Sequence, residues 1–188
     1  MKAASEMMER GITGIDIVKA LKSKGFDDLA DSLLKLMKLR VSGDHLHTSA
    51  ILDKDFNVNV MTKSDGTINQ AVGGHQDTAA GAKISVILAP LMRARIPIIV
   101  DKVTTVCTPG EAVDVICTDY GIVVNPRRKD LIETLTKAGV ELKTIEEMKE
   151  MAEQLTGKPD PVEFTDEIVG VVEYRDGSII DVIKKVKD

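Results

Sequence analysis

The clearest signal for the fold comes from three short, almost wholly apolar runs, ISVILAP (84–90), IPIIV (96–100) and VDVIC (113–117). Continuous runs of valine and isoleucine are typical of strands that are buried on both faces, as in a mainly parallel sheet covered by helices. Pro97 falls at the start of its run, a position that a strand tolerates. We therefore expect an α/β fold with a mainly parallel sheet flanked by helices.

The residues before these runs predict a change from helix to strand. Residues 1–40 carry leucines at helical spacing, so we expect a helical N-terminal segment there and an α/β domain over 41–188. Phe56, Val58 and Val60 alternate with polar residues, which is the period of a half-buried strand.

The residues after these runs predict two helices and a terminal hairpin. One helix is expected around 129–138. A second should start at Thr144, because Thr144 and Glu147 have the spacing of a capping box. The turn sequence RDGS (175–178) separates two strand-like runs, which predicts a C-terminal β-hairpin.

The composition is that of an ordinary globular protein. The chain has 188 residues, 43% of them apolar and 3% aromatic, and a formal net charge of −5. No apolar run approaches the ~20 residues that span a bilayer, and the first residues lack the apolar stretch of a signal peptide. We therefore expect a cytoplasmic protein that binds no membrane. An acidic chain with so few aromatic side chains is also poorly suited to nucleic acid.

The negative charge is concentrated in one stretch of the chain. Residues 141–166 hold eight acidic and three basic side chains, so the remainder is balanced. That remainder contains two basic groups, one including Arg93 and Arg95 and the other Arg127 and Arg128. The two groups would form an anion site if the fold brought them close together, and a solvated surface is the alternative.

The most unusual segment is AVGGHQDTAAGAK (71–83). Gly73 and Gly74 allow backbone conformations that other residues avoid and let a ligand approach the main chain closely. Asp77 or Thr78 can cap a helix whose first amides would favour a phosphate, a carboxylate or an oxyanion. The segment is neither a Walker loop nor a dinucleotide fingerprint. A tight structural turn remains the alternative to a functional loop.

Other reactive side chains make weaker cases. His45, His47 and His75 suggest a metal site, but zinc needs three or four ligands in a compact arrangement, and no metal is expected. Cys107 and Cys117 fit a reducing compartment and should pack as small apolar residues. No G-x-S-x-G sequence supports a nucleophilic serine, so no catalytic residue can be assigned.

From about Asp55 onward the sequence resembles the C-terminal half of the citrate lyase alpha chain, the citrate CoA-transferase subunit. The matching segments are DFNVNV (55–60), SDG (64–66), GGHQDTAAGAKISVILAPL (73–91), RARIP (93–97), DKVTTVCTPGEAVDVICTDYGIVVNPRR (101–128), EFTDEIV (163–169) and EYRDGSIIDVIKKVK (173–187). They are ungapped and cover most of the chain.

The resemblance implies a CoA-transferase-like (NagB/RpiA/CoA-transferase-like) domain that exchanges citrate for acetyl on a thioester. Acetyl-CoA or the acyl-carrier-protein thioester would be the acyl donor, with no tightly bound cofactor. The implied partners are citrate, the citrate lyase beta (lyase) subunit, the acyl carrier protein and an N-terminal transferase half, because the family chain is much longer. We also expect an oligomer. The alternatives are a non-catalytic CoA- or citrate-binding or regulatory module and a transferase domain for another acid.

The resemblance also indicates which residues meet the substrate. Acyl exchange builds an oxyanion at each step, which preorganised amides stabilise. Candidate amides are those of Gly73, Gly74, Asp77 and Thr78. Candidate contacts to a carboxylate or phosphate are His75, Asn59, Arg93, Arg95, Arg127 and Arg128, and each arginine could instead pair with a nearby acid. Gln76 stands where the family usually has cysteine, which excludes a cysteine nucleophile there.

Overall fold

The structure is a computed structural model that describes residues 22, 27, 50–93 and 95–187. The chain divides into two compact units, Met1–His47 and Thr48–Asp188. The helical segment expected over 1–40 lies outside the described residues, apart from Lys22 and Asp27, which are both helical. The second unit is therefore the one described below.

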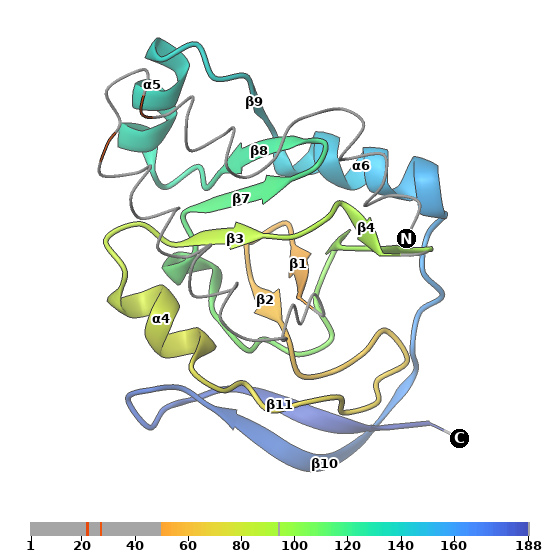
Figure 1. The fold of residues 1–188 in the computed structure, drawn as a ribbon. Helices are drawn as coiled ribbons and strands as arrows, with labels where there is room; N and C mark the ends of the chain where they lie inside the picture. The colour runs from red at the N-terminus through yellow and green to blue at the C-terminus, as the bar shows by residue number, and fades with distance from the viewer. Residues whose placement is uncertain (1–21, 23–26, 28–49, 94, 188) are drawn as a thin grey trace. The chain divides into compact units, whose positions relative to one another are not determined.

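This second unit is a small mixed α/β domain (Figure 1). Its elements, in chain order, are β1 (Ile51–Asp53), β2 (Val58–Asn59), α4 (His75–Gly81), β3 (Val86–Leu88), β4 (Met92–Arg93), β5 (Ile96–Pro97), β6 (Ile99–Val100), the 3-10 helix η1 (Gly110–Ala112), β7 (Val115–Thr118), β8 (Gly121–Val124), α5 (Lys129–Lys137), β9 (Leu142–Lys143), α6 (Ile145–Thr156), β10 (Phe164–Glu173) and β11 (Ile179–Val186). Among the described residues, no helix combines the length and the apolar character that a membrane span requires.

The predicted α/β class is confirmed, but the predicted single, mainly parallel sheet is not. Among the described residues there are two sheets of more than two strands, β3-β7-β8-β9 and β2-β1-β6, and each mixes parallel with antiparallel pairs. The physical reason lies between β7 and β8. Only Asp119 and Tyr120 separate these strands, so the chain turns back as a hairpin and has no length for a crossover helix.

The core is built by the apolar runs together with one face of α6. Leu52, Val58, Ile99, Ile116 and Met148 are all 0% exposed and come from β1, β2, β6, β7 and α6. Burial of side chains of this size stabilises the unit by roughly 1.5–3 kcal/mol each. The core therefore joins both larger sheets and the last helix into one packed unit.

The two predicted helices are confirmed. α6 begins directly after Thr144, whose hydroxyl accepts from the Glu147 amide at 3.1 Å, while the Glu147 carboxylate accepts from the Thr144 amide at 2.7 Å. This reciprocal pair is the predicted capping box. α5 occupies most of the range expected for it, and Gly139, with φ of +74°, lies just beyond its end.

The predicted C-terminal hairpin is also confirmed. β10 and β11 pair antiparallel, and the Asp176 carboxylate accepts from the amide and hydroxyl of Ser178 in the connecting turn. In Figure 1 the two long blue strands run past α4. Val172 and Ile183 are buried on the inner face of the hairpin, so it is packed onto the rest of the unit.

Candidate functional site

The two glycines before α4 have different structural requirements. Gly73 has φ of +59°, a conformation that favours glycine. Gly74 has φ of −85°, which any residue adopts, and a Cβ placed on it would find only the Thr78 hydroxyl, at 4.0 Å. Neither backbone conformation nor packing therefore requires glycine at 74. Glycine there does leave the main chain open to a ligand.

The helix begins earlier than the sequence predicted. Its first residue is His75 and its N-cap is Gly74, without a side-chain cap, so the prediction that Asp77 or Thr78 caps it is wrong. The hydroxyl and the amide of Thr78 both donate to the Gly74 carbonyl, at 2.7 and 3.0 Å. The Thr78 amide is therefore not available to an oxyanion. The reason is the left-handed turn at Gly73, which starts the helix two residues before the predicted cap.

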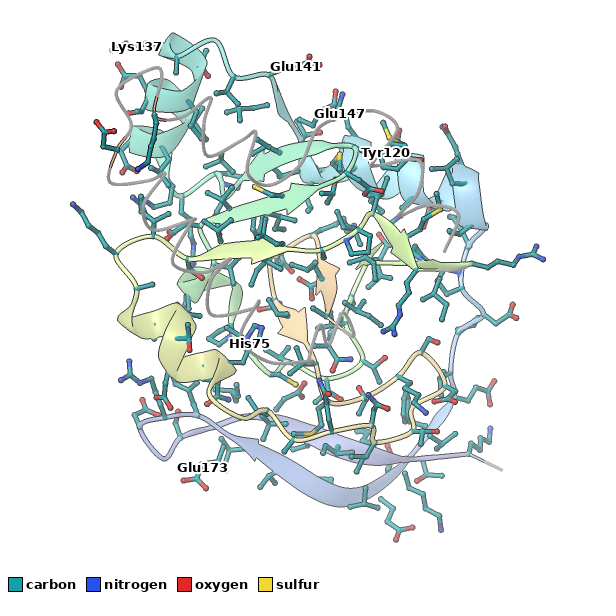
Figure 2. All side chains as sticks on the ribbon, viewed as in Figure 1. His75, Tyr120, Lys137, Glu141, Glu147 and Glu173 are labelled. Carbon is teal, nitrogen blue, oxygen red and sulfur yellow. The ribbon has the colours of Figure 1, made fainter. Side chains whose placement is uncertain are left out.

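His75 and Gln76 attach the start of α4 to the segment 107–108. Nδ1 of His75 lies 2.8 Å from the Thr108 hydroxyl. The Gln76 side-chain amide donates to the carbonyl of Cys107 at 2.8 Å and to that of Glu173, on the hairpin, at 3.2 Å. Gln76 is buried, whereas His75 is half-buried. Figure 2 shows His75 on the side of α4 that faces the strands and Glu173 on the hairpin beyond the helix.

Asp77 faces the hairpin. One of its carboxylate oxygens lies 3.3 Å from Nε of Arg175, and both side chains are well exposed. An exposed pair of this kind contributes at most about 1 kcal/mol. Asp77 therefore strengthens the contact between α4 and the hairpin and is not directed toward Thr108.

Asn59 is placed in the core and not at a ligand site. Its side chain is 0% exposed. The amide nitrogen donates to the carbonyl and hydroxyl of Thr62, and the amide oxygen accepts from the backbone amides of Met61 and Thr62. These bonds fix the turn after β2, and they also explain why this polar residue points inward where a half-buried strand was predicted.

The first pair of predicted arginines lies away from α4. Arg93 ends β4 and Arg95 lies just before β5, so both belong to a short antiparallel hairpin, and both are exposed. Figure 1 places β4 and α4 at different edges of the unit. The structure therefore does not bring these arginines to the Gly73–Gly74 loop.

Arg128 forms ion pairs with two carboxylates. Its guanidinium makes a two-pronged bond to Asp130, at 2.9 and 2.8 Å, and lies 2.7 Å from Asp114. The side-chain hydrogen bond from Arg128 lowers the pKa of Asp130 to about 2, and the two carboxylates raise the pKa of the guanidinium. The alternative of local pairing, left open by the sequence, describes Arg128.

Arg127 lies beside a hollow of about 450 Å³. The hollow is lined by Lys54, Asp55, Phe56, Asn57, Pro109, Gly110, Glu111, Asn125, Pro126 and Arg127. Glu111 lies 3.8 Å from Arg127, and both side chains are about two-thirds exposed, so this ion pair is weak. Of the four predicted arginines, Arg127 is thus the one that borders a cavity.

The walls of this hollow are held rigidly. Phe56 is buried and has φ of +66°, the one positive φ outside glycine among the described residues. A Cβ on Gly110 would lie 1.8 Å from the Asp55 carbonyl oxygen, so the two backbone segments are in direct contact. The Asn125 side chain donates to the Gly110 carbonyl at 3.0 Å. Sequence reasoning missed these residues, although the Pro109-Gly110 pair is a turn signal that could have indicated them.

The α4 loop and the hollow share one segment of chain. Thr108 contacts His75, and the next two residues, Pro109 and Gly110, line the hollow. Helix α4 also packs against η1, which begins at Gly110. A ligand at the loop and one in the hollow would therefore contact opposite sides of residues 108–110.

The cysteines do not provide a nucleophile. Cys107 and Cys117 are both buried, and burial raises the pKa of each thiol, to about 12 for Cys117. A thiol with such a pKa stays protonated at neutral pH and is a poor nucleophile. The described residues contain no group of His, Cys, Asp and Glu side chains that could hold a metal ion, and His45 and His47 lie outside them.

Fold and site together define a small mixed α/β domain with a glycine loop open to a ligand and a half-buried histidine at the start of the following helix. The family model for the citrate lyase alpha subunit (CitF) matches residues 42–186. The chain therefore belongs to the citrate lyase alpha subunit family.

Individual relatives agree with this assignment. The chain is 61% identical over 137 residues to the citrate lyase alpha chain of Klebsiella pneumoniae and 54% identical to that of Escherichia coli (strain K12), in each case over 73% of this chain and 27% of the relative. A solved structure from Streptococcus mutans, described as an alpha subunit of citrate lyase in complex with citrate, is similar with a TM-score of 0.71 at 54% identity. That likeness covers 73% of this chain and 27% of the other. The chain thus spans about a quarter of the length of the relatives it matches.

Proposed function

We propose that this chain contributes one part of a citrate CoA-transferase, which exchanges citrate for the acetyl group of a CoA or acyl-carrier-protein thioester. Family membership supports the reaction class. The structural observation that carries the proposal is Gly74, whose open surroundings and ordinary backbone leave ligand approach as the reason for glycine. The likeness to a structure described as citrate-bound supports a CoA-transferase-like fold for residues 41–188.

The chemistry requires two successive acyl transfers. A citrate carboxylate oxygen attacks the thioester carbonyl, and the tetrahedral intermediate expels the thiolate to leave a mixed anhydride of citrate and acetate. The thiolate then attacks the citryl carbonyl of the anhydride and expels acetate, which gives the citryl thioester. Each intermediate carries an oxyanion, which fixed hydrogen-bond donors stabilise.

The residues of the α4 loop have properties suited to these steps. The main chain at Gly73 and Gly74 is unobstructed by neighbouring atoms. His75 is half-buried and fixed against Thr108, so its ring can donate to a carboxylate or to the developing oxyanion. Arg127, beside the hollow, is the proposed contact for a second carboxylate or a phosphate of the thioester carrier.

The remaining parts of the transferase are proposed to come from other chains. This chain covers 27% of each matched citrate lyase alpha chain. We assign the missing share to an N-terminal transferase half on a separate polypeptide, and the lyase subunit and acyl carrier protein to the same assembly. Activity is therefore expected only in a reconstituted oligomer.

The test is acyl exchange between citrate and acetyl-CoA, followed by mass spectrometry of the citryl thioester. The chain is assayed alone, with an N-terminal half taken from a family member, and with acyl carrier protein added. We expect the citryl thioester only when the N-terminal half is present. Absence of exchange in every mixture would exclude the proposed function, and ligand-induced stabilisation without turnover would instead indicate a binding module.

A matched pair of variants tests the glycine loop within that assay. Gly74→Val places a branched side chain over the open main chain, and Gly81→Val makes the same change at the other end of α4, where a Cβ also meets open space. We expect Gly74→Val to abolish exchange and Gly81→Val to retain it, with both variants folded by circular dichroism. Equal activity of the two variants would show that the loop is only a turn.

A further inference from the structure

Thr108 is held in place by the core and not by the loop that it contacts. It is 0% exposed. Its backbone amide donates to the Val58 carbonyl at 3.0 Å, and its carbonyl accepts from the Val58 amide at 2.9 Å. Val58 lies in β2 and is itself fully buried. The position of the Thr108 hydroxyl is therefore fixed independently of α4.

The His75 ring meets this fixed hydroxyl through Nδ1, at 2.8 Å. A neutral imidazole carries one proton, so it has one donor nitrogen and one acceptor nitrogen. A hydroxyl can take either role, and the role it takes at Nδ1 determines whether Nε2 carries the proton. Thr108 is thus in a position to select the tautomer of His75.

We propose that Thr108 is a positioning residue that donates its hydroxyl proton to Nδ1 of His75 and thereby keeps the ring proton on Nε2. This inference rests on the proposed function, because only that tautomer lets a neutral His75 donate from Nε2 to a citrate carboxylate or to the oxyanion. The bond also fixes the plane of the ring, since one of its nitrogens is tied to the core.

The mechanical attachment of α4 does not depend on this bond. Gln76 already ties the helix to the Cys107 carbonyl and to the Glu173 carbonyl on the hairpin. Loss of the Thr108 hydroxyl therefore leaves α4 attached while it removes the partner of Nδ1. A purely structural role and a tautomer-setting role predict different results for the same variant.

The experiment is ¹⁵N NMR of the histidine rings in the full chain at a pH where His75 is neutral. The chain has three histidines, and His75→Gln assigns the signals of the third. In the wild type we expect the neutral ring to carry its proton on Nε2. Thr108→Val should give a mixture of tautomers, and Thr108→Ser, which keeps the hydroxyl, should restore the wild-type spectrum.

In the reconstituted exchange assay, Thr108→Val should lower kcat about tenfold, the effect of one lost hydrogen bond, while Thr108→Ser stays near wild type. A wild-type ring protonated on Nδ1, or an unchanged spectrum in Thr108→Val, would overturn the inference. The NMR result is obtained without substrate and on the wild type as well as the variants. It is therefore distinguishable from a failure of the proposed function and does not depend on the folding of one variant.

Discussion

Replacing Asn59 with alanine should destabilise the chain strongly without acting at a ligand site. The substitution removes two bonds from the side-chain amide to Thr62, at 3.0 and 2.9 Å, and two bonds, both 3.0 Å, from the amides of Met61 and Thr62 to the side-chain oxygen. Thr62 is only 3% exposed, so its released groups have little access to water. A buried polar group left without a partner costs about 1–3 kcal/mol.

With two such groups stranded on Thr62, we expect Asn59→Ala to lower the free energy of unfolding by roughly 3–5 kcal/mol. Native proteins are stable by about 5–15 kcal/mol, so this is a large share of the total. Urea denaturation followed by circular dichroism measures the change. Asn69→Ala is the matched control, because Asn69 is exposed and its loss should cost less than about 0.5 kcal/mol. A loss below about 1 kcal/mol in Asn59→Ala, together with weakened citrate binding, would refute this reasoning and return Asn59 to the ligand site.

Three further substitutions test other parts of the unit. Gly110→Ala places a Cβ 1.8 Å from the Asp55 carbonyl oxygen, so thermal unfolding should show a loss of about 1–3 kcal/mol or more. The pKa of Asp130 is about 2 in the folded chain and ordinarily near 3.8, so its pairing with Arg128 stabilises the fold above that range and is lost as the pH falls toward 2. Asp130→Asn should therefore flatten the loss of stability between pH 4 and pH 2, measured by denaturation at each pH. Thr144→Ala removes the hydroxyl of the capping box and should cost about 1 kcal/mol in urea denaturation.

Features with a local physical cause were predictable from the sequence. The capping box needs only Thr144 and Glu147, four positions of chain that interact with one another. The terminal hairpin needs only the Asp-Gly turn at 176–177 between two β-forming runs. In both cases the stabilising contacts lie within the segment that carries the signal, so the pattern and the structure agree.

The sheet arrangement depended on contacts that no single segment contains. The run at 113–117 does form a buried strand, β7, with β3 as its parallel neighbour, as predicted. Its other neighbour is β8, reached through Asp119 and Tyr120, and this antiparallel pair breaks the expected parallel order. An apolar run indicates burial, but it does not indicate which strand pairs with it or in which direction.

The same limit explains the candidate site. Gly73, Gly74 and His75 were placed correctly in one loop because they are neighbours in sequence. Thr108 was missed, since its contact with His75 joins residues 33 positions apart and the type of residue alone carries no such signal. Asn59 was misassigned for the converse reason, as its partners at Met61 and Thr62 give it a turn-forming role that a surface asparagine can share.

The arginines show why counting charge along the chain overstates the field at a site. Arg128 faces Asp114 and Asp130, so its charge is largely neutralised by carboxylates within 3 Å. Arg93 lies in the β4–β5 hairpin, apart from α4, and beyond a Debye length of about 8 Å its charge would be largely screened by salt. The α4 loop therefore offers a ligand main-chain dipoles and an imidazole, with Arg127 at the adjoining hollow. Such a set orients a carboxylate and stabilises an oxyanion, but it is less suited to neutralising a trianion. The division of labour in the proposed transferase follows from this difference: this chain stabilises the reacting acyl centre, and the proposed N-terminal half supplies further positive charge for citrate.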